Sequence, residues 1–245
     1  MPDGQKIVLF GATSGIAIEI ARIYASRNCS LVLVARDAGK LEALAQDLEV
    51  RGASVTTIVS DLNQLERHDE LINDTQNADV FYVLYGSLPD QSDCETNWSS
   101  AQAALHTNFI SVASLLTRIA NVCEQRAAGS IVVVGSVAGD RGRGSNYIYG
   151  AAKGGLALFC DGLRNRLSSS KVNVLVVKPG FVDTPMTADI EKKPAVLWAD
   201  AAKVASDIVG AQDKLKNTLY TPWFWRYIML IIKSVPENIF KKLSL

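Results

Sequence analysis

The chain alternates short apolar runs, rich in β-branched residues, with longer stretches of helical periodicity. One run, Ile131-Val132-Val133-Val134, is apolar at every position, which indicates a strand buried on both faces. Parallel sheets acquire such burial because each crossover connection places a helix over one face. The pattern therefore predicts one α/β domain, a doubly wound parallel sheet of about seven strands with helices on both faces.

Six apolar runs fit strands, over residues 6–10, 30–35, 54–59, 79–84, 130–135 and 172–178. Helices are expected between and after them, over residues 16–27, 40–51, 65–77, 99–126, 148–168 and 200–212. Ligands of such open sheets bind beyond the carboxyl ends of the strands. The residues directly after each apolar run are therefore the candidates for a functional site.

Composition limits the classes of partner. The 245 residues carry 25 basic and 25 acidic side chains, so the balanced charge gives no reason to expect nucleic-acid binding. The four cysteines form no C-x-x-C pair, and neither His68 nor His106 has a second ligand at metal spacing, so no metal site is expected. The N-terminus has no signal-peptide pattern, and we expect a cytoplasmic protein.

A turn of small residues follows the first predicted strand and leads into a helix. Amide groups and the helix dipole at such a turn can receive a pyrophosphate, as in Rossmann-type domains. The alternative is a tight turn that binds nothing. We expect five residues of this turn to contact a dinucleotide: Gly11, Thr13, Ser14, Gly15 and Ile16.

The residue after the second strand bears on the choice of dinucleotide. Sites for NAD usually carry an acidic residue there, whereas this chain has Arg36, whose guanidinium suits a 2′-phosphate. The alternatives are a solvated arginine and a ribose contact from Asp37. After the third strand, Asp61 and Leu62 are expected beside the adenine, unless Asp61 only caps the next helix. NADP(H) is the favoured cofactor and NAD(H) the alternative.

A second group of polar residues suggests the reacting centre. Tyr149 and Lys153 are four residues apart, on one face of a predicted helix. Ser136 follows the fifth strand, thirteen residues before Tyr149, and Asn108 lies upstream in a long predicted helix. Together with the glycine turn, these residues resemble the short-chain dehydrogenase/reductase family, with matching motifs from Gly11 to Thr184.

The resemblance implies a catalytic tetrad of Asn108, Ser136, Tyr149 and Lys153. In the family the serine binds the substrate carbonyl, the tyrosine exchanges the proton and the lysine lowers the tyrosine pKa and binds the ribose. The asparagine interrupts its helix and holds a water molecule; the alternative is an asparagine facing out of the helix. The remaining cofactor contacts implied by the family are Gly86, Pro179, Gly180, Val182 and Thr184.

Two departures from the family pattern stand out. Ala17 replaces the third glycine of the turn, which adds a methyl group where a helix approaches the sheet. The usual Asn-Asn-Ala-Gly after the fourth strand is replaced by Val83-Leu84-Tyr85-Gly86, which removes its usual supporting hydrogen bonds. We expect Tyr85 to reshape the nicotinamide pocket.

Residues 222–245 form an aromatic and basic helical tail behind a dinucleotide-binding and catalytic domain of residues 1–221. The apolar run in the tail is too short to span a bilayer, so it packs on the domain, on another subunit or at a membrane surface. The tail, Tyr85 and the Arg141/Arg143 loop resemble, more loosely, the decaprenylphosphoryl-2-keto-ribose reductases of the family.

We therefore expect an NADP(H)-dependent reductase of a ketone on a hydrophobic or lipid-linked keto-sugar substrate. The first alternative is another carbonyl, such as a 3-ketoacyl, steroid or keto-lipid substrate. From a different class, a non-catalytic NADPH-binding protein or membrane scaffold remains open. The expected partners are a small-molecule or lipid-linked carbonyl compound, a second copy of the chain in a homo-oligomer, and a membrane surface.

Overall fold

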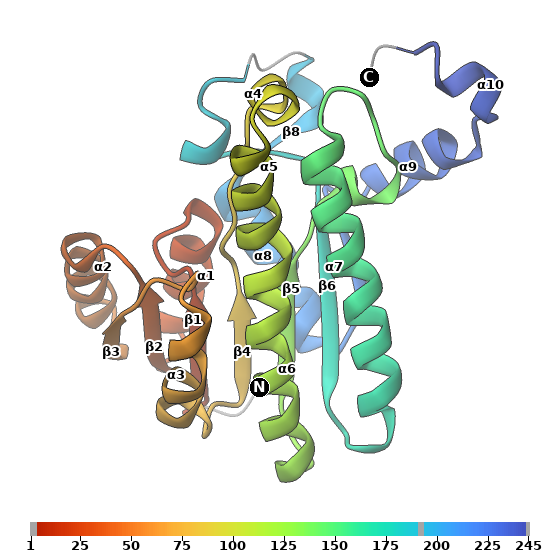
Figure 1. The fold of residues 1–245 in the computed structure, drawn as a ribbon. Helices are drawn as coiled ribbons and strands as arrows, with labels where there is room; N and C mark the ends of the chain where they lie inside the picture. Colours follow the sequence, from red (N-terminus) through yellow and green to blue (C-terminus); the bar gives the residue numbers. More distant parts are fainter. Residues whose placement is uncertain (1–3, 191–193, 244–245) are drawn as a thin grey trace.

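The computed structural model describes residues 4–190 and 194–243. Its centre is an all-parallel sheet of seven strands in the order β3-β2-β1-β4-β5-β6-β9 (Figure 1). The predicted Rossmann-type fold is confirmed. The strands of this sheet are β1 (Lys6–Phe10), β2 (Ser30–Ala35), β3 (Ser54–Val59), β4 (Val80–Val83), β5 (Ser130–Val134), β6 (Asn173–Pro179) and β9 (Thr218–Thr221).

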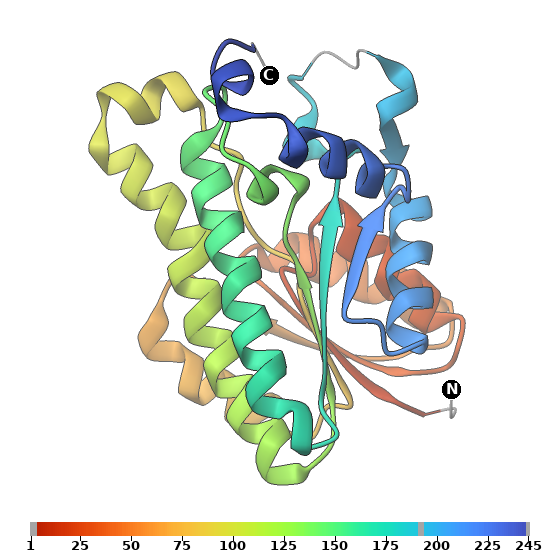
Figure 2. The same cartoon turned by 90° about the vertical axis from the view of Figure 1, so that its right-hand side faces the viewer.

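Helices cover both faces of the sheet (Figures 1 and 2). One face is covered by α1 (Gly15–Ala25), α2 (Ala38–Val50) and α8 (Ala201–Asp213), and the other by α3 (His68–Thr75), α6 (Ser111–Arg126) and α7 (Tyr147–Arg166). Side chains of one strand alternate between the two cores, so Ile7 and Leu9 face the first group of helices while Val8 and Phe10 face the second. This burial on both sides explains why the strands are apolar at nearly every position.

The remaining elements are short and gather near the carboxyl ends of the strands or at connections. They are α4 (Gln91–Thr96), α5 (Trp98–Leu105), α9 (Trp225–Ser234), α10 (Glu237–Phe240), a two-stranded parallel sheet of β7 (Phe181–Asp183) and β8 (Trp198–Asp200), a π-helical turn η2 (His106–Ile110), and the 3₁₀ turns η1 (Leu65–Arg67), η3 (Val137–Asp140), η4 (Leu167–Ser169), η5 (Pro185–Thr187) and η6 (Ala195–Leu197).

The structure differs from the sequence prediction in two places. The helix expected over residues 99–126 is divided into α5, the turn η2 and α6. The seventh strand, β9, lies outside the six predicted runs because its four residues, Thr-Leu-Tyr-Thr, lack a continuous apolar pattern. It is nevertheless placed in the sheet by pairing with β6 from Val176 to Pro179.

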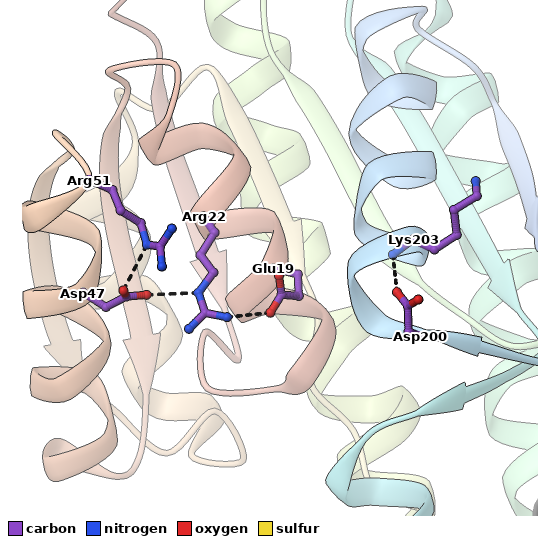
Figure 3. Close-up of polar contacts among 6 residues, drawn as sticks. All are labelled: Glu19, Arg22, Asp47, Arg51, Asp200 and Lys203. Atoms are coloured by element: carbon purple, nitrogen blue, oxygen red, sulfur yellow. Dashed lines mark hydrogen bonds and ion pairs between the residues drawn. The ribbon is translucent and has the colours of Figure 1, made fainter.

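Polar contacts tie the first two helices together (Figure 3). Arg22 on α1 donates to Glu19 over 2.7 Å and to Asp47 on α2 over 3.0 Å, and Arg51 donates to the other oxygen of Asp47 over 3.0 Å. These groups are partly exposed, so each contact contributes little, about 0–1 kcal/mol. Together they connect α2 to α1.

The tail packs on the domain through one face of α9, which crosses the carboxyl ends of β6 and β9 (Figure 2). Trp225 and Met229 are buried against Val137 in a small apolar cluster of their own. The opposite face exposes Tyr227, Leu230 and Ile231, and Trp223 is exposed just before the helix begins. Among the described residues, no helix combines the length and apolar character that crossing a membrane requires.

Truncation of the buried face of α9 tests this packing. Met229→Ala is expected to lower the free energy of unfolding by about 2–5 kcal/mol, because Met229 is fully buried. Leu230→Ala, on the exposed face of the same helix, is the matched control and should change it by less than about 0.5 kcal/mol. Urea denaturation measures both, and equal effects of the two variants would contradict the packing described here.

Candidate active site

A cavity of about 730 Å³ opens at the carboxyl ends of the strands. It lies where the chain order of the sheet reverses between β1 and β4, the usual ligand position in open α/β sheets. Every residue predicted for the site lines this cavity. These residues are Gly11, Thr13, Ser14, Gly15, Ile16, Arg36, Asp61, Leu62, Gly86, Asn108, Ser136, Tyr149, Lys153, Pro179, Gly180, Val182 and Thr184.

The turn after β1 has the geometry that a pyrophosphate site needs. Gly11 has a φ of +82°, and a Cβ added there would lie 2.8 Å from the Cβ of Tyr85. Ser14 caps α1 by accepting a hydrogen bond from the Ala17 amide. A Cβ on Gly15 would lie 3.0 Å from Thr184, so the segment after β6 closes over the start of α1. Backbone amides and the helix dipole thus face the cavity.

At the end of β2 only one of the two candidate residues reaches the cavity. Arg36 is exposed and lines it. Asp37 instead caps α2, where its carboxylate accepts from the Lys40 amide over 3.0 Å and lies 3.8 Å from the Lys40 ammonium. This placement favours Arg36 over Asp37 as the residue that meets the adenosine half of a dinucleotide.

Two histidines hold the loop after β3. His68 donates from Nε2 to the carbonyl of Leu62 over 2.9 Å, and His106 donates from Nε2 to the carbonyl of Asn63 over 3.0 Å. Ser111 also donates to the Leu62 carbonyl. Burial lowers the pKa of His68, so it stays neutral. The two histidines thus hold the backbone at Leu62 and Asn63, directly after Asp61.

Asn108 is completely buried in the π-helical turn η2, not facing out of its helix. Its amide nitrogen donates to the carbonyls of Ala104 and Ser87, each over 2.9 Å, and its oxygen accepts from the Ser87 amide over 3.1 Å. A Cβ on Gly86 would lie 2.6 Å from this oxygen and 3.4 Å from Lys153 Nζ. Asn108 therefore supports the backbone after β4, and only glycine fits between it and Lys153.

Ser136, Tyr149 and Lys153 meet at the other end of the cavity. The Ser136 hydroxyl accepts from the Ala138 amide over 3.1 Å and is also hydrogen-bonded to Tyr149. Lys153 donates to the carbonyl of Val134 over 3.1 Å and lies 5.8 Å from the centre of the Tyr149 ring. Burial lowers the pKa of Lys153 to about 8, whereas it raises the pKa of Tyr149 to about 12, a rise that Ser136 opposes.

Comparison with known proteins agrees with this geometry. The sequence profile of the family described as short chain dehydrogenase matches residues 5–195. The chain belongs to the short-chain dehydrogenase/reductase family. The predicted family and its oxidoreductase class are thus confirmed.

Individual relatives cover most of the chain. An uncharacterised oxidoreductase of Mycobacterium tuberculosis is 34% identical over 242 residues, which cover 97% of this chain and 96% of the relative. A 3-oxoacyl-[acyl-carrier-protein] reductase of Bos taurus is 31% identical over 208 residues, 82% and 88% of the two chains. A solved short-chain dehydrogenase from Sphingobium yanoikuyae in complex with NADPH shares the fold, with a TM-score of 0.83 at 23% identity, covering 95% and 97% of the chains.

The two departures from the family pattern are absorbed by packing. The Ala17 methyl is fully buried in the core beneath α1. Tyr85 lines the cavity, yet its hydroxyl points away to Ser111, at 2.8 Å, so the ring fills space between β4 and α6. The hydrogen bonds of Asn108 to Ser87 support the backbone that the usual asparagines of this short-chain dehydrogenase segment would stabilise.

Several residues that the sequence did not assign to the site also line the cavity, among them Arg143, Asn146 and Trp225. Each of these three has a buried polar atom without a hydrogen-bond partner among the described residues. Trp225 from α9 lies directly over Gly180, where an added Cβ would come within 1.8 Å of the indole nitrogen. The tail of this short-chain dehydrogenase thereby forms one wall of the cavity.

The cavity suits a dinucleotide and offers no evident metal site. No group of three or more His, Cys, Asp or Glu side chains is placed to hold a metal ion in residues 4–190 and 194–243. Asn63, whose buried side-chain oxygen has no partner in the same part of the chain, lines the cavity beside Asp61. Unpaired polar atoms beside the glycine turn are what an extended polar ligand such as a nicotinamide dinucleotide would satisfy.

Proposed function

We propose that this protein is an NADP(H)-dependent reductase that converts a ketone on a hydrophobic substrate into a secondary alcohol. The observation that carries the proposal is a single cavity with Arg36 at one end and Ser136, Tyr149 and Lys153 at the other. A dinucleotide bound along the glycine turn would place its 2′-phosphate at the first end. Relatives support both nicotinamide forms, since similar solved structures hold NADPH and NAD.

The residues at the catalytic end divide the chemistry between them. When bound, NADPH supplies the hydride for the carbonyl carbon. Ser136 donates its hydroxyl proton as a hydrogen bond to the carbonyl oxygen, and Tyr149 transfers a proton to that oxygen. Because burial keeps the phenol protonated at neutral pH, Tyr149 is ready to act as the acid. The Lys153 ammonium stabilises the phenolate that remains, which then regains a proton from solvent.

The lining beside Tyr149 supports a hydrophobic substrate, with apolar side chains from the segment after β6 and from the tail: Phe181, Met186, Ile190 and Trp225. A 3-ketoacyl chain fits this lining and is supported by the relative named 3-oxoacyl-[acyl-carrier-protein] reductase. The keto sugar on a lipid, expected from the tail, has no support from the relatives. A panel of ketones of both classes decides between them.

Two expectations about partners stay predictions. The exposed apolar face of α9 is flanked by the basic residues Arg226 and Lys233, a combination that suits contact with a membrane surface. The same face suits a second copy of the chain. The proposed division of the chain at residues 221 and 222 separates the domain from a tail whose Trp225 lines the cavity, and we propose that this tail contacts the substrate.

Tyr149→Phe tests the proposed acid directly. The variant keeps the ring but loses the proton donor, so kcat for ketone reduction should fall by about 100-fold or more. Stopped assays with NADPH measure turnover, and calorimetry should give the same Kd for NADPH as the wild type. Turnover that survives the substitution would refute the assignment of Tyr149.

The pH dependence of reduction follows from Lys153. The protonated ammonium is the active form, so kcat/KM should be full below pH 8 and fall as pH rises through about 8, where Lys153 loses its proton. Lys153→Met should have a low kcat/KM at every pH and should not show this fall near pH 8. A wild-type profile that stays flat well above pH 8 would contradict the role given to the lysine.

Arg36→Ala tests the cofactor preference. Loss of charge-assisted hydrogen bonds to a 2′-phosphate should weaken NADPH binding by about 10- to 100-fold and leave NADH binding unchanged. Lys40→Ala, on the exposed surface of α2 and outside the cavity lining, is the matched control. Equal affinity of the wild type for NADPH and NADH would contradict the proposal that Arg36 binds the 2′-phosphate.

A further inference from the structure

Two arginines of one loop, Arg141 and Arg143, differ in how their side chains are bound. Arg141 donates to the carbonyls of Ile232 and Val235 over 2.5 and 2.7 Å, and to Glu237 over 3.0 Å. Its guanidinium also lies 3.6 Å from the ring centre of Phe240. Arg141 thus holds the tail against the domain through its hydrogen bonds.

Arg143, two residues later, has no such partners. Its side chain is half-buried and lines the cavity, its Nε is enclosed, and the guanidinium makes no hydrogen bond or ion pair with any described residue. Burial lowers the pKa of this guanidinium, and the negative charge of Asp140 opposes that shift only in part. A buried cation is costly unless something pairs with it.

Within the described residues, no carboxylate forms an ion pair with Arg143, although the charge of Asp140 acts on it from a distance. Asp140, three residues before Arg143, is held by Lys178 over 2.5 Å and by the Tyr220 hydroxyl over 2.7 Å. Asp61 is the one acidic residue among the described residues that line the cavity, and it belongs to the loop after β3. Arg143 stands in the loop between Ser136 and the helix of Tyr149, at the opposite, catalytic end.

We propose that Arg143 binds an anionic group, a phosphate or a carboxylate, on the ketone substrate. The planar guanidinium can hold either oxyanion with two parallel hydrogen bonds. The indole N–H of Trp225, which is buried without a partner among the described residues and also lines the cavity, can donate a further hydrogen bond to such an anion. This inference rests on the proposed function and narrows its substrate to an amphiphile with an apolar portion beside Phe181 and an anion at Arg143.

The test compares three ketones with one alkyl chain, which end in a phosphate monoester, a carboxylate or a neutral methyl ester, all at saturating NADPH. Wild type should prefer an anionic ketone. Arg143→Leu should lower kcat/KM for that ketone by about 10- to 100-fold, mainly through KM, and leave the neutral ester unchanged. Arg143→Lys keeps the charge but not the planar guanidinium, so its kcat/KM for the anionic ketone should lie between those of the wild type and Arg143→Leu. The ketone whose kcat/KM falls more, phosphate or carboxylate, identifies the anion.

Arg226→Leu is the matched control, because Arg226 is exposed on α9 and does not line the cavity. NADPH affinity should be the same in all of these variants. An equal loss on all three ketones in Arg143→Leu, or a wild type without preference for an anion, would overturn the subsite while leaving the reductase proposal intact.

Binding supplies a readout that is independent of turnover. Calorimetric titration of the NADPH complex of Tyr149→Phe with the anionic ketone should show binding that the added Arg143→Leu substitution weakens by the same factor. Absence of any effect of Arg143→Leu on that binding would overturn the proposal even if no ketone is reduced. Failure of the wild type to reduce any of them would instead count against the proposed function.

Discussion

Burial of a parallel sheet on both faces is the constraint from which the rest of the structure follows. Each strand contributes side chains to two cores, so helices must cover both sides, and the chain must change direction between β1 and β4 to place them. That change of direction opens the cavity at the carboxyl ends. All loops that follow β1 to β6 converge there, which brings together residues as distant in sequence as Gly11 and Gly180.

The site is held by contacts that do not themselves reach a ligand. Asn108 fixes the backbone after β4 through Ser87, and this fixes the space beside Lys153. Asp140 joins the turn after Ser136 to β6 and β9 through Lys178 and Tyr220. These hydrogen bonds hold Ser136, Tyr149 and Lys153 in fixed positions relative to the sheet.

Much of this arrangement was predictable from sequence. The continuous apolar strands gave the sheet, and the positions directly after them gave the cavity residues, because parallel strands end at one edge. The helix interruption at Asn108 was expected from the family resemblance alone, because helical periodicity does not reveal that its side chain turns inward to Ser87, which is distant in sequence. Strand β9 was missed because only its pairing with β6 defines it. Nor did the sequence distinguish Arg141, which binds the tail, from Arg143, which lines the cavity, because their contacts depend on where α9 and α10 pack.

The packing of α9 makes the tail part of the cavity wall. One face of α9 carries Trp225 to the backbone of Gly180, so a segment that looked like an appendage forms a wall beside the reacting groups. Arg141 secures the far end of the same wall. The position of the tail therefore sets the shape of the cavity at Gly180.

The most direct test of this account is a crystal structure of the protein with NADPH. The account predicts the dinucleotide along the glycine turn, with its 2′-phosphate at Arg36 and its nicotinamide facing the gap between Ser136 and Tyr149, beneath Trp225. A nicotinamide directed away from Tyr149, or a protein that takes up no dinucleotide in this cavity, would contradict it.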